Sequence, residues 1–407
     1  MRATKTKTSI PNTWKLVNLG DITSYTKGYA FKSINYTNKG SRVIRISDTN
    51  AHTIKDDNPI YVSNESGEYK KWELMEGDLV FTTVGSKPPM YDSMVGKVIK
   101  VQKKHQGALL NQNAVILRGI KEKVNQNYIY HNFKLKKYLN FIETIVRGNA
   151  NQVSITLKEL FTYKIPLPPL KEQKKIAEIL SQWDEAIETT QNLIEKLQLR
   201  KKGLMQALLS GKKRLSGFSE EWKEDKLGSY FTERKETGLD NLPLLSVGKE
   251  GVYPQDDSNK KDTSNSNKSK YKRICNGDIG YNTMRMWQGR SALSQLEGIV
   301  SPAYTILKPK ENCDSVFFSH LFKLDDMIHK FYRNSQGMVS DTWMCKFKDF
   351  KIVRFNAPSS IEEQKEISKI IGLADVEIEE KKAYLLKLKE QKKGLMQQLL
   401  TGKKRVK

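Results

Sequence analysis

Residues 172–180, EQKKIAEIL, and 201–215, KKGLMQALLSGKKRL, decide the fold, because both stretches occur again 191 positions later. The second copies read EQKEISKII at 363–371 and KKGLMQQLLTGKKRV at 392–406. Over the full gapless overlap of 44 residues, 22 pairs are identical. A repeat of that length, in a segment that is not of low complexity, predicts duplicated structure. The chain therefore has the order block A, helix, block B, helix.

Both copies place apolar residues at alternating spacings of four and three, which is the pattern of a coiled-coil seam. The seam positions are Ile176, Leu180, Trp183, Ile187, Thr190, Ile194, Leu197, Lys201, Leu204 and Leu208 in the first copy, and Ile367, Ile371, Ala374, Ile378, Lys381, Leu385, Leu388, Lys392, Leu395 and Leu399 in the second. Polar residues interrupt both seams at the same places, which helps to fix the register. Two equal helices pair most simply as an antiparallel coiled coil within one chain. A parallel pair stays open, because block B is long enough to span the return.

Blocks A and B both have the pattern of mixed α and β structure. Short β-rich runs such as SRVIRIS at 41–47 and DLVFTTV at 78–84 alternate with glycine, asparagine and aspartate turns, and a helical stretch follows them. Weak matches occur in the same order in both blocks: Trp14-Lys15 and Leu19-Gly20 with Trp222-Lys223 and Leu227-Gly228, Gly77-Asp78 with Gly277-Asp278, Ala114–Leu117 with Tyr304–Leu307, and Val153-Ser154 with Val339-Ser340. We expect the two blocks to share one fold and to differ in their surfaces.

The sequence therefore predicts the α+β class, with two mixed α/β domains, two long helices in an antiparallel coiled coil, and a pseudo-twofold internal repeat. The expected boundaries are 1–167 for the first domain, 168–214 for the first helix, 215–358 for the second domain and 359–407 for the second helix. Pro168 and Pro169 stop block A just before the first helix, and Pro358 stops block B before the second.

The 407-residue chain has 70 lysine and arginine residues against 46 aspartate and glutamate residues, a formal net charge of +24. Such an excess favours a polyanionic partner, with nucleic acid ahead of an anionic membrane. A lysine-rich proteome is the alternative explanation. No run of 18 apolar residues and no apolar signal segment occurs, so we expect no membrane span.

Motifs that would carry catalysis are missing from the sequence. There is no GxxxxGK[ST] phosphate loop, no GxGxxG after a strand, and no metal-ligand spacing among the five histidines. Cys275, Cys313 and Cys345 fit neither a disulfide framework nor a zinc cluster, and indicate reduced thiols in a cytoplasmic protein. The run Ser86–Tyr91 resembles the Asn/Asp-Pro-Pro-Tyr loop of amino-methyltransferases but lacks its acidic or amide residue. We expect no catalytic residue, no metal site and no cofactor in this chain.

Several short motifs occur in a fixed order around the paired helices. They are Trp14-Lys15, Leu19-Gly20, Gly28–Lys32, Val43–Ser47, Gly77–Val80, Pro166–Gln173 and Ser301–Tyr304. Together with the repeat, this order resembles the specificity (S) subunits of type I restriction–modification enzymes over essentially the whole chain. The second junction, Ala357–Gln364, departs from the pattern because it lacks the double proline.

This resemblance implies a DNA-binding subunit that catalyses nothing itself. Each block would be a target-recognition domain that reads one half of a split site in double-stranded DNA. The helices would set the spacer between the halves and dock two modification subunits, which bind S-adenosylmethionine and methylate adenine. Motor-nuclease restriction subunits would join them to cut unmodified DNA, in the cytoplasm and without a membrane partner.

A duplicated frame also predicts duplicated partners. The residues Gly203, Leu204, Met205 and Gln206 recur as Gly394, Leu395, Met396 and Gln397. Packing in a seam would tolerate other apolar side chains. We therefore interpret this segment as an external surface that docks each modification subunit; the alternative is good coiled-coil residues copied by the duplication.

The loops that follow the two Gly-Asp strands are the candidate DNA readers. In block A this is Gly85–Tyr91, with Ser86, Lys87 and Tyr91. In block B it is Met284–Arg290. Here Arg285 and Arg290 offer guanidinium groups that can donate two hydrogen bonds at once, Gln288 offers an amide, and Trp287 offers a ring for stacking. Arginine suits guanine and glutamine suits adenine in the major groove. Candidate phosphate contacts are Lys27, Lys32, Arg45, Lys268, Lys270, Lys272 and Arg273.

Two other classes of protein fit the same residues. One is a stand-alone DNA-binding regulator or coiled-coil scaffold that needs no methyltransferase. The other is an enzyme whose catalytic domain lies outside this chain. An adenine-methyltransferase motif in the neighbouring reading frame would favour the specificity subunit over both.

Overall fold

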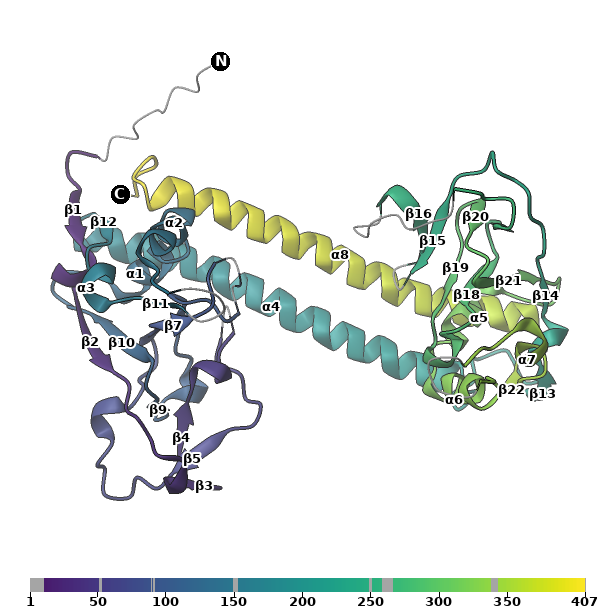
Figure 1. Ribbon diagram of the computed structural model, residues 1–407, viewed down its shortest axis with the longest axis horizontal. Coiled ribbons are helices and arrows are strands. Elements are labelled where there is room, and N and C mark those ends of the chain that lie inside the picture. Colours follow the sequence, from purple (N-terminus) through teal and green to yellow (C-terminus); the bar gives the residue numbers. More distant parts are fainter. Residues whose placement is uncertain are drawn as a thin grey trace, which may run out of the picture. The chain divides into compact units, whose positions relative to one another are not determined.

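A computed structural model describes residues 11–50, 53–88, 90, 92–148, 153–248, 251–257, 266–337 and 343–406 (Figure 1). The chain forms two compact units, each with its own core. Unit 1 consists of Met1–Thr190 together with Tyr384–Lys407, and unit 2 of Gln191–Ala383. The four segments expected from the sequence follow secondary-structure boundaries, whereas these units divide both long helices. Each unit therefore combines one block with one half of each helix.

The long helices are α4, Leu170–Leu208, and α8, Ile361–Leu399, of 39 residues each (Figure 1). The Pro169 carbonyl accepts the first hydrogen bond of α4, from the backbone N–H of Glu172 at 2.9 Å. At the start of α8 the hydroxyl of Ser360 accepts the backbone N–H of Glu363 at 3.3 Å, as an N-cap serine does. Beyond their C-termini, Gly211 and Gly402 have φ values of 71° and 74°, a left-handed conformation that glycine adopts without strain.

The predicted seam positions are all buried or half-buried in the structure. In unit 1, Asp184 of α4 pairs with Lys392 of α8, and the α4 residue Ile176 shares a core with Leu399. Residues later in α4 thus meet residues earlier in α8, so the two helix segments of unit 1 run antiparallel. In unit 2 the 2.5 Å ion pair Lys201–Asp375 repeats the pair of unit 1 with the helices exchanged.

Unit 1 contains three short helices and twelve strands in its described residues. The helices are α1 (Gln126–Asn132), α2 (Lys136–Ile145) and α3 (Leu157–Leu160). The strands are β1 (Lys15–Asn18), β2 (Thr23–Lys27), β3 (Tyr36–Thr37), β4 (Ser41–Ile44), β5 (Ile60–Val62), β6 (Leu79–Thr82), β7 (Val84–Gly85), β8 (Val98–Lys100), β9 (Leu109–Leu110), β10 (Ala114–Gly119), β11 (Val153–Ser154) and β12 (Lys164–Leu167).

Unit 2 has a closely similar order of elements. Its short helices are α5 (Ser315–Leu321), α6 (Asp325–Arg333) and α7 (Phe347–Phe350). Its strands are β13 (Lys223–Lys226), β14 (Phe231–Glu233), β15 (Leu245–Gly248), β16 (Gly251–Pro254), β17 (Lys272–Ile274), β18 (Ile279–Asn282), β19 (Ser291–Leu293), β20 (Gly298–Val300), β21 (Tyr304–Pro309) and β22 (Arg354–Ala357).

The central sheet has the same topology in both units. Its strand order is β2-β10-β6-β8 in unit 1 and β14-β21-β18-β19 in unit 2, antiparallel throughout. Each unit adds a two-stranded sheet that joins the start of the block to its end, β1-β12 and β13-β22. The sequence matches of β10 with β21 and of β6 with β18 thus lie on equivalent strands. The match at Val339-Ser340 lies outside the described residues.

Each sheet packs against helices around its own core. In unit 1 the core includes Phe81 and Tyr128, and in unit 2 Tyr281 and Phe318. The covering helices α1 and α5 begin alike, because the side chains of Asn125 and Asp314 accept the backbone N–H three residues later, at 3.0 and 3.1 Å. The units differ around this shared centre: unit 1 has the four-stranded sheet β3-β5-β4-β9, whereas unit 2 has the pairs β15-β16 and β17-β20.

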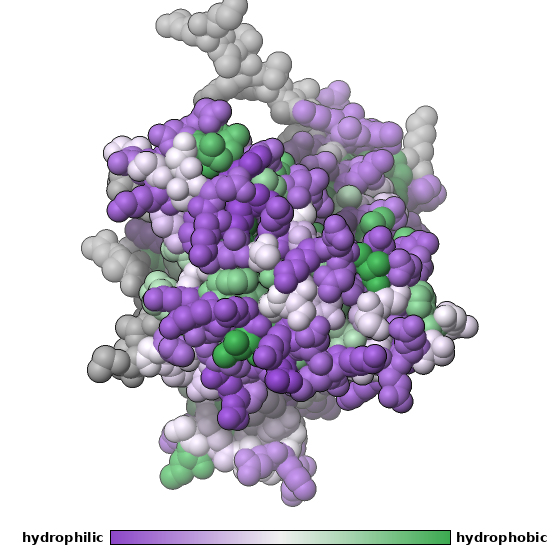
Figure 2. All heavy atoms as spheres, turned by 90° about the vertical axis from the view of Figure 1, so that its right-hand side faces the viewer, coloured by the Kyte–Doolittle hydropathy of each residue, from purple (hydrophilic) through white to green (hydrophobic). Residues whose placement is uncertain are grey.

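None of the helices in the described residues is both long enough and apolar enough to cross a bilayer. The face of the molecule that carries the unit 2 domain is largely hydrophilic, with hydrophobic side chains scattered singly over it (Figure 2).

Candidate nucleic-acid interface

The strands that lead into the two candidate reading loops start from the same anchor in both units. Asp78 and Asp278 precede β6 and β18, and each accepts a backbone N–H three residues earlier at 2.8 Å. Each also binds an arginine, Arg118 at 2.6 Å and Arg234 at 2.7 Å. These hydrogen bonds raise the pKa of both guanidinium groups and keep them charged. Each of the two strands therefore starts from a fixed point.

The anchor also explains the glycine of the Gly-Asp pair. Gly77 and Gly277 have φ values of 84° and 87°, a conformation that side chains with a Cβ rarely adopt. The sequence match at these positions thus marks a backbone requirement, and it is shared by the frame of both units.

In unit 1 the loop after β6 presents small polar groups. The backbone N–H of Ser86 donates to the Ser93 carbonyl at 2.8 Å, and the hydroxyl of Ser93 donates to that of Ser86 at 2.9 Å. Lys87 is exposed. Tyr91, the third predicted contact in this loop, lies outside the described residues. Ser86 and Lys87 thus stay candidates for contacts with DNA.

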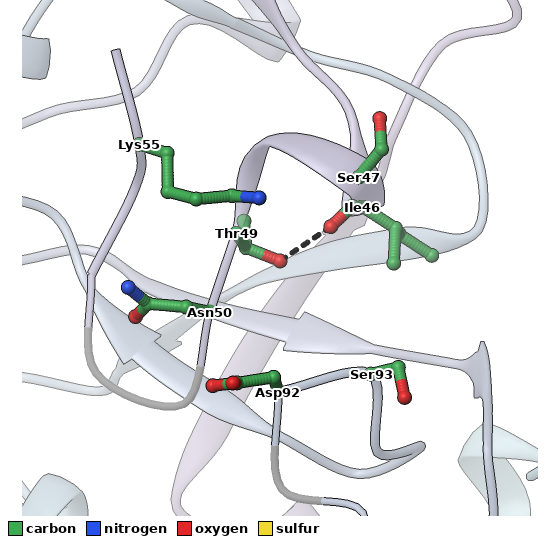
Figure 3. Close-up of a pocket in the computed structure, with 7 residues that line it drawn as sticks. All are labelled: Ile46, Ser47, Thr49, Asn50, Lys55, Asp92 and Ser93. Atoms are coloured by element: carbon green, nitrogen blue, oxygen red, sulfur yellow. Dashed lines mark hydrogen bonds between the residues drawn. The ribbon is translucent and has the colours of Figure 1, made fainter. Parts of the chain in front are cut away.

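Beside this loop lies a polar pocket of about 430 Å³, lined by Ile46, Ser47, Thr49, Asn50, Lys55, Asp92 and Ser93 (Figure 3). Below it, the ammonium of Lys97 donates to the carbonyls of Asp92 at 2.6 Å and Thr49 at 3.3 Å. Lys97 is 3 % exposed, and burial lowers its pKa to about 8. The buried lysine ties the two walls of the pocket together.

In unit 2 the loop after β18 presents larger groups. Arg285 and Trp287 are half-buried, whereas Gln288 and Arg290 are exposed. The indole N–H of Trp287 donates to the Met284 carbonyl at 3.0 Å. The structure thus brings the four predicted residues into one short turn around the 3-10 helix Met286–Gln288.

The candidate phosphate contacts fall into two groups. Lys27, Lys32 and Lys270 are exposed, and the half-buried Lys268 lies 4.8 Å from the ring centre of Tyr271. The others already bind groups of their own domain: Arg45 to Asp48 at 2.7 Å, Lys272 to the Tyr304 carbonyl at 2.8 Å, and Arg273 to Glu236 at 2.7 Å and Glu297 at 2.9 Å. A side chain that is bound in this way is less available to phosphate than an exposed lysine.

Sequence reasoning missed a feature that occurs once in each unit. In unit 1, Glu172 at the start of α4 accepts the indole N–H of Trp14 at 3.1 Å and the Arg405 guanidinium at 2.6 Å. Arg405 also lies 5.7 Å from the Trp14 ring centre. Burial alone would raise the pKa of Glu172, but the hydrogen bonds from Arg405 and Trp14 lower it. We call this cluster the unit 1 clamp.

Unit 2 has the same cluster, the unit 2 clamp. Glu363 accepts the indole N–H of Trp222 at 3.2 Å and the Arg214 guanidinium at 2.8 Å. Arg214 lies 5.7 Å from the Trp222 ring centre. Both clamps could have been predicted from the sequence. The glutamate and the arginine recur in the repeat of 191 positions, and Trp14 matches Trp222 at the start of the second block. Each clamp attaches the first strand of a domain to the helix pair.

The predicted docking residues do not all face outward. Gly203 and Gln206 are exposed, Leu204 and Met205 are half-buried, and Met205 packs against the unit 2 core. In the second copy Gln397 is exposed, Gly394 and Leu395 are half-buried, and Met396 is 7 % exposed within the unit 1 core. An external surface built from all four residues is therefore wrong at Met396, whose side chain lies in the unit 1 core, whereas Met205 only packs against the unit 2 core. The residue that is exposed in both copies is the glutamine.

Among the described residues no group of three or more histidine, cysteine, aspartate or glutamate side chains could hold a metal ion. Cys313 and Cys345 are buried and Cys275 is half-buried, and all three are free thiols. Burial raises the pKa of each thiol, which keeps it protonated and unreactive.

Known proteins share sequence with this chain. Residues 11–199 match the model of the type I restriction modification DNA specificity domain. Two curated proteins of Methanocaldococcus jannaschii match over 98% of this chain: the putative type I restriction enzyme MjaX specificity subunit, at 29% identity over 95% of its own length, and the MjaVIII specificity subunit, at 26% over 94%. The chain is thus similar to type I restriction–modification specificity subunits over almost its whole length.

Other relatives agree with this family. The type I restriction enzyme EcoBI specificity subunit of Escherichia coli is 30% identical over 58% of this chain and 44% of its own length. A solved specificity subunit from M. genitalium shares the fold, with a TM-score of 0.61 at 16% identity over 98% of both chains. These similarities support sequence-specific recognition of DNA.

Proposed function

We propose that this specificity subunit reads a bipartite DNA site, with one recognition domain on each half. We further propose that α4 and α8 form an antiparallel coiled coil that relates the domains by a pseudo-twofold axis and sets the spacer. The helices would dock two methyltransferase subunits, which bind S-adenosylmethionine, and restriction subunits would join that complex. The proposal rests on one observation. The central sheet, the clamp and the lysine–aspartate pair across the helices occur in both units, whereas the residues of the two candidate reading loops differ.

The repeated frame supports two equivalent positions for DNA and for partners. Both units have the same central sheet, the same clamp and the same lysine–aspartate pair across the helices. A buried charge that needs its partner disfavours other registers, which is the best-attested use of polar residues in a helix seam. Two rigidly based domains of one fold would present their loops to DNA in equivalent ways.

The different surfaces support two different half-sites. The loop after β6 offers serine hydroxyls and Lys87, whereas the loop after β18 offers Arg285, Trp287, Gln288 and Arg290. Side chains of these types contact different base edges in the major groove. The excess of 70 basic over 46 acidic residues supplies the attraction to phosphate that positions such contacts.

Exchange of one domain tests the proposal. Residues 14–165 are replaced by the corresponding block of another specificity subunit, and the chain is co-expressed with its methyltransferase. Sequencing of methylated sites should show that one half of the site has changed and the other has not. A change in both halves would contradict independent readers.

The rival function is a stand-alone DNA-binding regulator. The purified chain would then bind its site with full specificity in the absence of a methyltransferase, and would not co-purify with one. Under our proposal the chain alone binds DNA weakly and with strong salt dependence, and it transfers no methyl group from S-adenosylmethionine.

A further inference from the structure

Unit 2 carries a partly exposed group of aromatic rings beside its candidate reading loop. Trp287 lies in that loop, Tyr332 near the end of α6, and Trp343 just before the bridge that joins Met344 to Gln336. The ring centres are 5.5 Å apart for Trp287–Trp343, 4.8 Å for Tyr332–Trp343 and 6.5 Å for Trp287–Tyr332. We call these three rings the aromatic platform.

The aromatic platform is not part of the core of unit 2. None of its rings belongs to the buried clusters of the described residues, and Tyr332 is 43 % exposed. Large apolar rings that come together at a surface, from segments far apart in sequence, bury less area than the same rings would in a core. Such a group is typical of a contact surface.

The backbone under the platform is fixed. Gly289 has a φ of 71°, and a Cβ at this position would lie 2.8 Å from the Cδ1 atom of Ile328. The ammonium of Lys323 donates to the Gly289 carbonyl at 2.7 Å. On the other side, the backbone N–H of Cys345 donates to the Thr283 carbonyl at 2.9 Å, which holds the segment of Trp343. The rings are thus positioned before a ligand arrives, which lowers the entropic cost of binding.

The faces of the three rings are apolar, and the polar groups of the platform are at the ring edges. Tryptophan has a single donor, and that of Trp287 is used within the loop by the Met284 carbonyl. The groups next to the rings in sequence are polar and exposed: Gln288, Arg290 and Arg333. The surface therefore fits a ligand that combines a small apolar group with hydrogen-bonding edges and negative charge.

The major groove of DNA offers this combination at thymine. Its 5-methyl group makes apolar contacts, the paired adenine offers the edge that suits glutamine, and phosphates line the groove. A methyltransferase that docks on the repeated frame would need the same feature in both units. In unit 1 the position of Tyr332 is held by Glu143, which has no ring, when both are counted from the shared Phe-Lys-Leu that follows α1 and α5. The aromatic platform is therefore one of the features that differ between the units.

We propose that Trp287, Tyr332 and Trp343 recognise a thymine by its 5-methyl group, within the half-site that unit 2 reads. This inference rests on the proposed function and adds the chemical group that is recognised. It requires at least one thymine, on either strand, in that half-site.

The test uses the complete complex with its methyltransferase. The DNA duplex contains the site that this complex recognises and methylates. Each thymine is replaced in turn by uracil, which removes only the methyl group. One replacement in the unit 2 half-site should weaken binding about fourfold, because a buried methyl group contributes about 0.8 kcal/mol. Tyr332→Ala and Trp343→Ala should weaken binding to the thymine duplex and abolish the difference between thymine and uracil.

The controls separate this inference from the proposed function. Ile352→Ala removes another exposed apolar side chain of unit 2, 51 % exposed, and should leave the thymine–uracil difference unchanged. The inference is overturned if no thymine of that half-site responds to uracil, or if both platform variants keep the response. Loss of the methyltransferase from either variant, with the thymine–uracil difference intact, would assign the platform to protein docking. A complex that binds all sequences equally would instead overturn the proposed function.

Discussion

Lys97 of unit 1 and Arg290 of unit 2 occupy equivalent places with opposite surroundings. Each carbonyl accepts a backbone N–H from the end of the neighbouring strand, from Thr82 and Asn282 respectively, both at 3.1 Å. Lys97 is buried under a polar pocket, whereas Arg290 is exposed beside the aromatic platform. The backbone is thus the same at this place in both units, while the side chains on it differ.

The two long helices can be shortened without altering the reading loops. Deletion of 187–193 and 378–384 removes one heptad from each helix and keeps the seams in phase. Each helix becomes shorter by about 10 Å at ~1.5 Å per residue. We expect the half-site bases to stay the same while the spacer shortens by about three base pairs at ~3.4 Å each.

Sequencing of methylated sites measures this effect. Deletion from α4 alone is the control, because it moves Lys201 out of step with Asp375 and should abolish assembly. An active complex of the double deletion with an unchanged spacer would mean that another part of the assembly measures the distance.

The docking surface offers a second test of the repeat. Gln206→Arg in α4 should remove one methyltransferase subunit and leave the other, because Gln397 stays intact in the second copy. Gln397→Arg should have the same effect at the other position, and the double variant should lose both subunits. Native mass spectrometry of the complex counts them. If the double variant still binds two subunits, docking lies elsewhere; Glu195→Gln, an exposed change on α4, is the control.

Each clamp should stabilise only the unit in which it lies. Glu172→Ala leaves Arg405 and the Trp14 indole without their acceptor, and should lower the free energy of unfolding of unit 1 by about 1–3 kcal/mol, since Arg405 can still turn to solvent. Glu363→Ala should do the same in unit 2. Hydrogen exchange of core amides separates the two effects.

An exposed ion pair provides the reference for both clamps. Glu224→Ala breaks the pair with Arg354, in which both side chains are 57% exposed, and should cost less than about 0.5 kcal/mol. Equal losses in both units from a single clamp variant would refute independent attachment of the domains.

The smallest expected effect concerns the buried lysine of unit 1. Burial lowers the pKa of Lys97 from 10.5 to about 8, so above pH 8 the folded state releases a proton that the unfolded state keeps. The stability of unit 1 should therefore rise with pH, by about 1 kcal/mol between pH 8 and pH 9. Lys97→Met should remove this rise and the exposed Lys87→Met should keep it, as measured by denaturant unfolding.

Local and repeated patterns made much of this fold predictable. The seam spacing gave α4 and α8 and their buried positions, and Gly77-Asp78 and Gly277-Asp278 marked equivalent strands. These features depend on periodicity and on backbone conformation, which a sequence carries directly.

Features that depend on tertiary contacts were not predictable. The ion pairs that Glu236 and Glu297 form with Arg273, a candidate phosphate contact, come from other segments of the chain. Met396 was expected on the outside, but its helix face turns into the unit 1 core. Tyr332 was not foreseen next to Trp287 because 45 residues separate them in sequence.

The unit 1 clamp has a consequence for synthesis of the protein. Unit 2 is a continuous stretch, Gln191–Ala383, and all of its residues have been made before the last part of α8 is translated. Unit 1 needs Arg405, which lies near the end of this sequence, to reach Glu172. Unit 1, most of which precedes unit 2 in the chain, is thus completed after unit 2, and the part of its core that packs against the end of α8 stays uncovered until then. Exposed apolar surface promotes aggregation during folding, so unit 1 would depend more on chaperones than unit 2.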